Sequence, residues 1–203
     1  MVESYGGGIC QVSTTLYLAV LRSELEVTER YSHSMTVSYV KPSMDAAIAE
    51  GVKDFKFVNN TDAPIYIEAS AGDGEVAFAI YGHETRDPSR TVEFESETLS
   101  TTEPTTTITL DSSASYGSVT ETSSGHTGSS ARLWKIVYVN GEEQSREQIN
   151  SSEYQMSPRT YTVGTGGAGA EAVSAISAAA ATGDLNQVYQ AISQYPNGQA
   201  PSE

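Results

Sequence analysis

The first residues of the chain include side chains that together could carry out nucleophilic chemistry. Cys10, the only cysteine, follows three glycines and lies at the expected start of a helix, where unpaired N–H groups and the helix dipole stabilise a thiolate. A nucleophilic cysteine needs a base and a group that orients the base, and His33 and Asp45 follow in that order. The amide of Gln11 could donate a hydrogen bond to an oxyanion. The same residues also fit a small buried cysteine and a structural histidine, so both interpretations stay open.

No other group of side chains predicts chemistry of its own. His83 and His126 have no partner at the spacing of metal ligands, and we therefore expect no metal ion. The glycines at positions 6–8 are not followed by lysine or by serine or threonine at the spacing of a phosphate-binding loop. No cofactor is expected.

Length and composition exclude several classes of protein. The 203 residues allow one large or two small domains, and the net charge of -15 would repel phosphate backbones and anionic lipids. Nucleic-acid binding is therefore not expected. The longest apolar run, Leu16 to Leu21, is far shorter than the roughly 18 residues that a membrane span needs. The single cysteine excludes an intramolecular disulfide, and residues 1–4 lack the features of a secretory signal.

Residues 1–84 are predicted to form an α+β unit. Apolar residues in 10–22 recur at helical spacing, which predicts an amphipathic helix. Residues 35–40 alternate in the manner of a strand. A hairpin is expected to join 65–69 to 75–81 through the turn at 71–74.

Residues 85–165 are predicted to form a separate, small all-β module. The strongest strand is 133–139, and Asn140-Gly141 predicts a tight hairpin that returns through 145–151. Residues 111–130 are almost all serine, threonine, glycine and small residues, which is typical of a long mobile loop. We expect no core that unites 10–22 with 133–139.

Residues 166–203 form a Gly/Ala-rich tail. Its composition predicts two short helices, at 169–182 and 185–194, that are marginal or disordered because they offer little apolar surface. The predicted fold class is thus an α+β N-terminal unit, with one helix and antiparallel strands, followed by a small all-β module and a helical or flexible tail.

The segment from Gly6 to Tyr17, with the sequence GGGICQVSTTLY, resembles the signature of the VanW-like family, which is named for an accessory protein of vancomycin-resistance gene clusters. The usual Pro-x-Gly-x-Asp-Ala motif has lost its glycine in Pro42–Ala46 but keeps Asp45. The family's domain normally begins some tens of residues before the glycines. The resemblance therefore implies that residues 1–84 are the C-terminal part of a domain whose N-terminal half is missing. It continues through residues 29–30, 33–34, 37–40, 45–46, 54–61 and 64–67.

The second module is similar to the G-five domain family of bacterial surface proteins. The resemblance rests on residues 137–143, 145–152, 158–159 and 163–165. It implies binding of glycans that contain N-acetylglucosamine, in a module that commonly follows VanW-like domains in Gram-positive envelope proteins. Independently of the resemblance, Trp134, Tyr138 and Tyr154 could form an exposed aromatic ledge for a glycan, although a core tryptophan and ordinary sheet tyrosines fit the same pattern.

Two functions follow from these observations. In the first, the protein associates with peptidoglycan or N-acetylglucosamine glycans of the cell envelope, and the VanW-like part has an unsettled activity. In the alternative, it is a cysteine-dependent enzyme that acts on peptidoglycan or its peptides through Cys10, His33 and Asp45. Both predict a surface or secreted protein associated with the cell wall, with no nucleic-acid partner and no membrane insertion of this chain.

Overall fold

The computed structural model describes residues 7–199, which fall into two compact units. The first unit holds the residues up to Thr101 together with Ser129–Tyr154. The second holds Thr102–Gly128 and the residues from Gln155 on. The chain therefore passes from the first unit into the second, returns to the first, and ends in the second.

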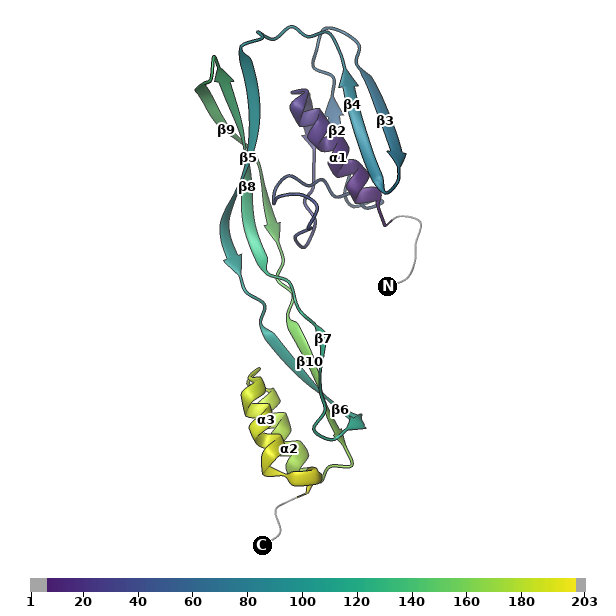
Figure 1. Ribbon diagram of the computed structural model, residues 1–203, viewed down its shortest axis with the longest axis vertical. Helices are drawn as coiled ribbons and strands as arrows, with labels where there is room; N and C mark the ends of the chain where they lie inside the picture. The colour runs from purple at the N-terminus through teal and green to yellow at the C-terminus, as the bar shows by residue number, and fades with distance from the viewer. Residues whose placement is uncertain (1–6, 200–203) are drawn as a thin grey trace. The chain divides into compact units, whose positions relative to one another are not determined.

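The first unit combines one helix with three small sheets (Figure 1). Helix α1 confirms the prediction for residues 10–22, and its apolar spacing buries one face, where Tyr17 and Val20 are almost inaccessible. The strands pair as β1-β2, as β3-β4 and in the order β5-β8-β9. The elements are α1 (Ile9–Arg22), β1 (Glu26–Glu29), β2 (Lys56–Val58), β3 (Tyr66–Gly72), β4 (Glu75–Tyr81), β5 (Arg90–Thr102), β8 (Gly128–Val139) and β9 (Glu142–Tyr154).

Both predicted hairpins are present, β3-β4 and β8-β9. Their turn residues have left-handed backbone angles: φ is 53° at Asp73 and 81° at Gly74, and 53° at Asn140 and 82° at Gly141. Two consecutive positive φ angles define the turn whose twist matches the flanking strands, which is why Asp-Gly and Asn-Gly predict these hairpins. In contrast, residues 35–40 form no strand, so that prediction is wrong.

The core of the first unit contains residues from both of the modules that were predicted to be separate, 1–84 and 85–165. Tyr17 and Leu21 of α1 pack with Ala46 and with Leu133 of β8. The predicted independence of the module that starts at residue 85 is therefore corrected, because β5, β8 and β9 bury one face of their sheet against the helix. Partly buried Leu18, Val27, Met44, Phe55, Phe94 and Ile149 complete this core.

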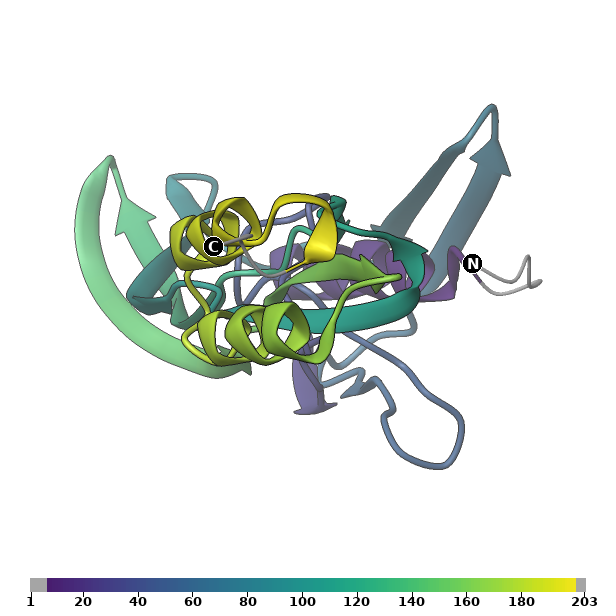
Figure 2. The ribbon, with the colours of Figure 1, turned by 90° about the horizontal axis from the view of Figure 1, so that it is seen from below.

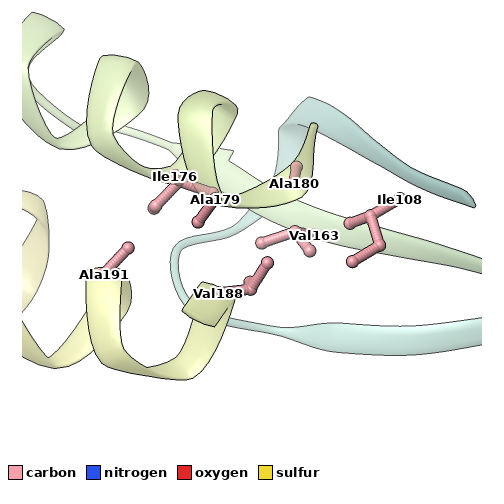
Figure 3. Close-up of a cluster of buried hydrophobic side chains, with 7 residues drawn as sticks. All are labelled: Ile108, Val163, Ile176, Ala179, Ala180, Val188 and Ala191. Carbon is pink, nitrogen blue, oxygen red and sulfur yellow. The ribbon is translucent and has the colours of Figure 1, made fainter. Parts of the chain in front are cut away.

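The second unit is a three-stranded sheet covered by a helical hairpin. Strand β10 lies between β6, to which it is parallel, and β7, to which it is antiparallel. Helices α2 and α3 lie side by side (Figure 2) and bury small and branched apolar side chains against the sheet (Figure 3). The elements are β6 (Thr106–Ser115), β7 (Val119–Ser123), β10 (Arg159–Gly166), α2 (Ala170–Ala180), α3 (Leu185–Gln194) and the 3-10 turn Pro196–Gly198, and the core is Ile108, Val163, Ile176, Ala179, Ala180, Val188 and Ala191.

Two predictions for this region are wrong. Residues 111–130 are not a mobile loop, because β6 extends into them and β7 lies within them. The helices of the tail lie close to their predicted positions, but they are not marginal, since Ile176 and Val188 are completely buried. Within residues 7–199, no helix is both long and apolar enough to cross a membrane.

Candidate functional site

The centre of the candidate site is the carboxylate of Asp45, which is completely buried in the first unit. Its Oδ2 accepts a hydrogen bond from the backbone N–H of His33 at 2.7 Å and lies 2.7 Å from His33 Nδ1. Its Oδ1 accepts hydrogen bonds from the hydroxyl of Tyr154 at 2.6 Å and from Arg30 Nη2 at 2.8 Å. Four donors therefore surround one carboxylate, and a buried charge is tolerated only in such an environment.

Helix α1 and Arg30 hold the segment that carries Asp45, which lies outside helices and strands. Thr14 accepts a hydrogen bond from the N–H of Ala46 at 3.0 Å, and Ser13 donates to the carbonyl of the same residue. Arg30 Nε donates to the carbonyl of Asp45 at 2.6 Å. The backbone at Asp45 and Ala46 is thus held by α1 and by Arg30.

Asp45 is held in its ionised form. Burial raises the pKa of Asp45, but hydrogen bonds from Tyr154 and from the backbone and side chain of His33, together with the charge of Arg30, lower the pKa by more. The pKa of Asp45 therefore lies below its usual range. An ionised Asp45 can only accept at Oδ2, so His33 carries its proton on Nδ1 when the ring is neutral.

The other ring nitrogen of His33 faces Tyr39. The hydroxyl of Tyr39 lies 3.3 Å from His33 Nε2, and the two rings meet edge to face. Burial raises the pKa of Tyr39, and a hydrogen bond with Thr14 lowers it by less. Tyr39 therefore lies beside the imidazole, in a partly buried position.

Cys10 lies in the first turn of α1, as predicted, and its side chain is half-buried. Its Sγ donates to the carbonyl of Ile48 at 3.5 Å, and no hydrogen bond joins it to His33 among residues 7–199. Gln11 is exposed and lines a groove of about 450 Å³ together with Thr14, Tyr39 and Val40. The structure thus joins Asp45 to His33, and Tyr39 connects this pair to the region of Cys10.

The geometry of Asp45 and His33 is like that of the carboxylate and imidazole in a catalytic triad. A carboxylate on Nδ1 fixes the tautomer of the imidazole and leaves Nε2 without a proton, and here this nitrogen faces the hydroxyl of Tyr39. Sequence reasoning gave no role to Arg30 or Tyr39. It also assigned Tyr154 elsewhere, because no spacing signal indicates a contact between residues 109 positions apart.

The predicted aromatic ledge must be corrected. Tyr154 is only 5% exposed and its hydroxyl binds Asp45, so Tyr154 cannot contact a glycan. Trp134 and Tyr138 are half-buried and lie on one face of β8, since they are four residues apart on a strand. The indole of Trp134 donates to Glu97 at 2.7 Å, and the guanidinium of Arg132 lies 4.6 Å from the centre of its ring.

In the described part of the chain, no three His, Cys, Asp or Glu side chains are grouped so that they could hold a metal ion.

Comparisons with known proteins identify two regions in the chain. Residues 1–81 match the family model "VanW like protein", and residues 93–166 match the model of the G5 (G-five) domain. The uncharacterised protein YoaR of Bacillus subtilis (strain 168) is 46% identical over 79 residues, which are 39% of this chain and 26% of YoaR. The chain thus covers about a quarter of the length of that relative.

Two solved structures are similar to part of this chain. The IgA1 protease G5 domain is 27% identical, with a TM-score of 0.28, and the match covers 38% of this chain and 93% of that one. The crystal structure of HP0197-G5 is 17% identical, with a TM-score of 0.22, and the match covers 37% and 95%.

Proposed function

We propose that the protein belongs to the cell envelope and associates with peptidoglycan through glycans that contain N-acetylglucosamine. In this chain a VanW-like region precedes a G5 domain. The match of residues 93–166 to the G5 domain carries this proposal, because the domain family is expected to bind such glycans. The protein would act at the cell surface or after secretion. With a net charge of -15, it would not be retained by anionic wall polymers through simple ion pairing.

The face of β8 that carries Trp134 and Tyr138 is the surface that we propose for a glycan. Sugars present C–H groups to aromatic rings and hydroxyl groups to polar side chains, so carbohydrate contacts favour an aromatic ring with a polar edge. Trp134 and Tyr138 supply the rings. Glu97 and Arg132 fix the indole of Trp134 from two sides and supply polar groups beside it. A ring that is already fixed loses little conformational entropy when a ligand binds.

Replacing Trp134 with alanine should weaken retention on purified peptidoglycan about tenfold, because the stacking surface is lost. The measurement is a pull-down with increasing amounts of cell wall, at low and at moderate salt. Tyr66→Ala is the matched control, since Tyr66 is 65% exposed on β3 and should leave retention unchanged. Failure of the unaltered protein to bind at either salt concentration would contradict the proposal, and equal retention of both variants would exclude the β8 face.

A second candidate function is cysteine-dependent catalysis on peptidoglycan or its peptides, favoured by the hydrogen bond between Asp45 and His33 Nδ1. In this mechanism Cys10 attacks an acyl carbon while His33 Nε2 takes the thiol proton and Asp45 orients the ring. The bond from the acyl carbon to its leaving amine then breaks as His33 gives the proton to the amine, and water releases the acyl group from Cys10. Gln11 would donate to the oxyanion from the exposed first turn of α1. Tyr39 must leave His33 Nε2 before Cys10 can reach it, because its hydroxyl lies 3.3 Å from that nitrogen.

The thiol itself provides a test that needs no substrate. If His33 activates Cys10, iodoacetamide should alkylate the folded protein well below about pH 8, and His33→Ala should slow the reaction about tenfold. Mass spectrometry reads a single site, because Cys10 is the only cysteine. His83→Ala is the control and should react like the unaltered protein, since His83 is exposed and has no contact with Asp45 in the structure. A thiol that stays inert, or equal rates for all three proteins, would leave Cys10 a structural residue.

A further inference from the structure

The two oxygens of Asp45 are bound by different parts of the chain. His33, within the VanW-like region, contacts Oδ2 through both its backbone and its ring. Tyr154 contacts Oδ1 and lies on β9, within the G5 region, 109 residues further along the chain. The carboxylate that orients the imidazole is therefore itself held by a residue of the second sequence family.

A buried network connects β9 to the loop around Asp45. The hydroxyl of Tyr154 accepts a hydrogen bond from the N–H of Ser43 at 2.7 Å while it donates to Asp45, so both its donor and its acceptor capacity are used. Ser152 receives a hydrogen bond from Ser43 Oγ and another from Arg30 Nη1, each at 2.9 Å. Asp45, Ser43, Ser152 and Tyr154 are all at most 5% exposed. Water therefore cannot readily replace a lost partner.

The backbone of the loop also depends on this support. Ser43 has a φ of 64°, in the left-handed region that side chains other than glycine adopt at a cost. Hydrogen bonds from the backbone and the side chain of Ser43 to β9 stabilise the conformation that glycine would adopt without them.

We infer that Tyr154 is a positioning residue for the Asp45–His33 pair, and that β9 of the G5 region completes the site of the VanW-like region. Without the hydroxyl of Tyr154, Oδ1 keeps only Arg30 as a donor. Asp45 can then rotate about its remaining contact with Arg30, which weakens the contact of Oδ2 with His33 Nδ1. Tyr154→Phe should therefore release the tautomer of His33 while the ring still fills its place in the core.

This inference deepens the second candidate function, in which His33 is the base, but it concerns the imidazole alone. The nitrogen resonances of isotope-labelled histidine report the tautomer directly in the full chain, and the three histidines are few enough to assign through single substitutions. At about pH 8.5, where a free imidazole is neutral, the unaltered protein should show His33 as the Nδ1–H tautomer. Tyr154→Phe should shift the signal towards the tautomer mixture of a free imidazole.

Tyr17→Phe is the matched control. It removes another buried hydroxyl from the same core, one that accepts a hydrogen bond from Asn150 and makes none with Asp45. It should leave the tautomer of His33 unchanged. If Tyr154→Phe folds and His33 keeps the fixed tautomer, the inference is overturned.

A further variant decides the question if Tyr154→Phe does not fold. Ser152→Ala removes the hydroxyl that binds both Arg30 and Ser43, and it should also shift the signal of His33 towards the mixture. An unchanged signal in Ser152→Ala would overturn the inference in that case. If Cys10 of the unaltered protein is alkylated slowly but Tyr154→Phe shifts the His33 signal as predicted, the positioning role of Tyr154 is retained and the catalytic role of Cys10 is rejected.

Discussion

Replacing Asp45 with alanine is expected to lower the free energy of unfolding by about 3–5 kcal/mol, because it breaks a buried ion pair from one side. The side chain of Arg30 is only 7% exposed and would keep its charge without a carboxylate. The hydroxyl of Tyr154 and the backbone N–H of His33 would also lose their acceptor. Urea denaturation followed by circular dichroism measures the loss.

Asp54→Ala provides the comparison. Asp54 is 59% exposed and lies 3.5 Å from Lys56, so its removal should change the stability by no more than about 0.5 kcal/mol. Equal denaturation midpoints for Asp45→Ala and Asp54→Ala would show that the buried network contributes nothing to the fold.

The same carboxylate predicts how stability depends on pH. The pKa of Asp45 is lower in the folded protein than in the unfolded chain, so the unfolded chain takes up the proton first as the pH falls. The contribution is therefore complete above about pH 4 and is lost as the pH falls through the pKa of the folded protein. Asp45→Asn should make the free energy of unfolding less dependent on pH in this acidic range. Glu24, whose pKa is lowered to about 2 chiefly by its hydrogen bond with Arg90, retains part of the dependence in that variant.

Local signals in the sequence predicted the helices and hairpins well. The first turn of α1, the Asp73-Gly74 turn and the Asn140-Gly141 turn each depend on a few adjacent residues, and all three are present. The prediction of a loop for residues 111–130 is wrong because a sequence rich in serine and threonine gives no signal of strand pairing. β10 supplies the partner of both β6 and β7, and β10 lies far along the chain.

Non-local pairing also explains the error at residues 35–40. Their alternating pattern predicts a strand, but no strand of the chain pairs with them in the described residues. Instead the hydroxyl of Tyr39 approaches His33, which a pattern of apolar and polar residues does not encode. Alternation of apolar and polar residues indicates which side chains would share a face if the segment were a strand. A strand forms only where a neighbouring strand also binds its backbone N–H and C=O groups.

The candidate site shows the same limit. Residue types and order indicated that His33 and Asp45 belong together, and the structure joins them by a hydrogen bond of 2.7 Å. Their supports, Arg30 and Tyr154, were not foreseen, because only the folded chain brings β9 to Asp45. The boundary of the family regions near residue 84 likewise differs from the boundary of the compact units. The sheet β5-β8-β9 has an apolar face that α1 covers.

Gly164→Ala is expected to destabilise the second unit by about 3 kcal/mol, because the added methyl group meets backbone that cannot move away. A Cβ at position 164 of β10 would overlap the carbonyl oxygen of Ser115 and the hydroxyl of Ser118. These groups are fixed, since Gly164 accepts a hydrogen bond from Gly117 at 2.9 Å and donates one to the carbonyl of Ser118 at 2.8 Å. Thermal unfolding, together with hydrogen exchange of the amides in α2, α3 and β10, measures the effect.

Gly72→Ala is the control for this change, because a Cβ at position 72 of β3 has open space around it and should alter the stability by no more than about 0.5 kcal/mol. Equal unfolding temperatures for the two variants would show that β10 can shift without cost.

Peptidoglycan pull-down with the same pair then assigns the binding face. If the β8 face binds the glycan, Gly164→Ala should retain binding at temperatures where the second unit is loosened, since Trp134 belongs to the first unit. Loss of binding in Gly164→Ala alone would move the glycan site to the sheet β6-β10-β7.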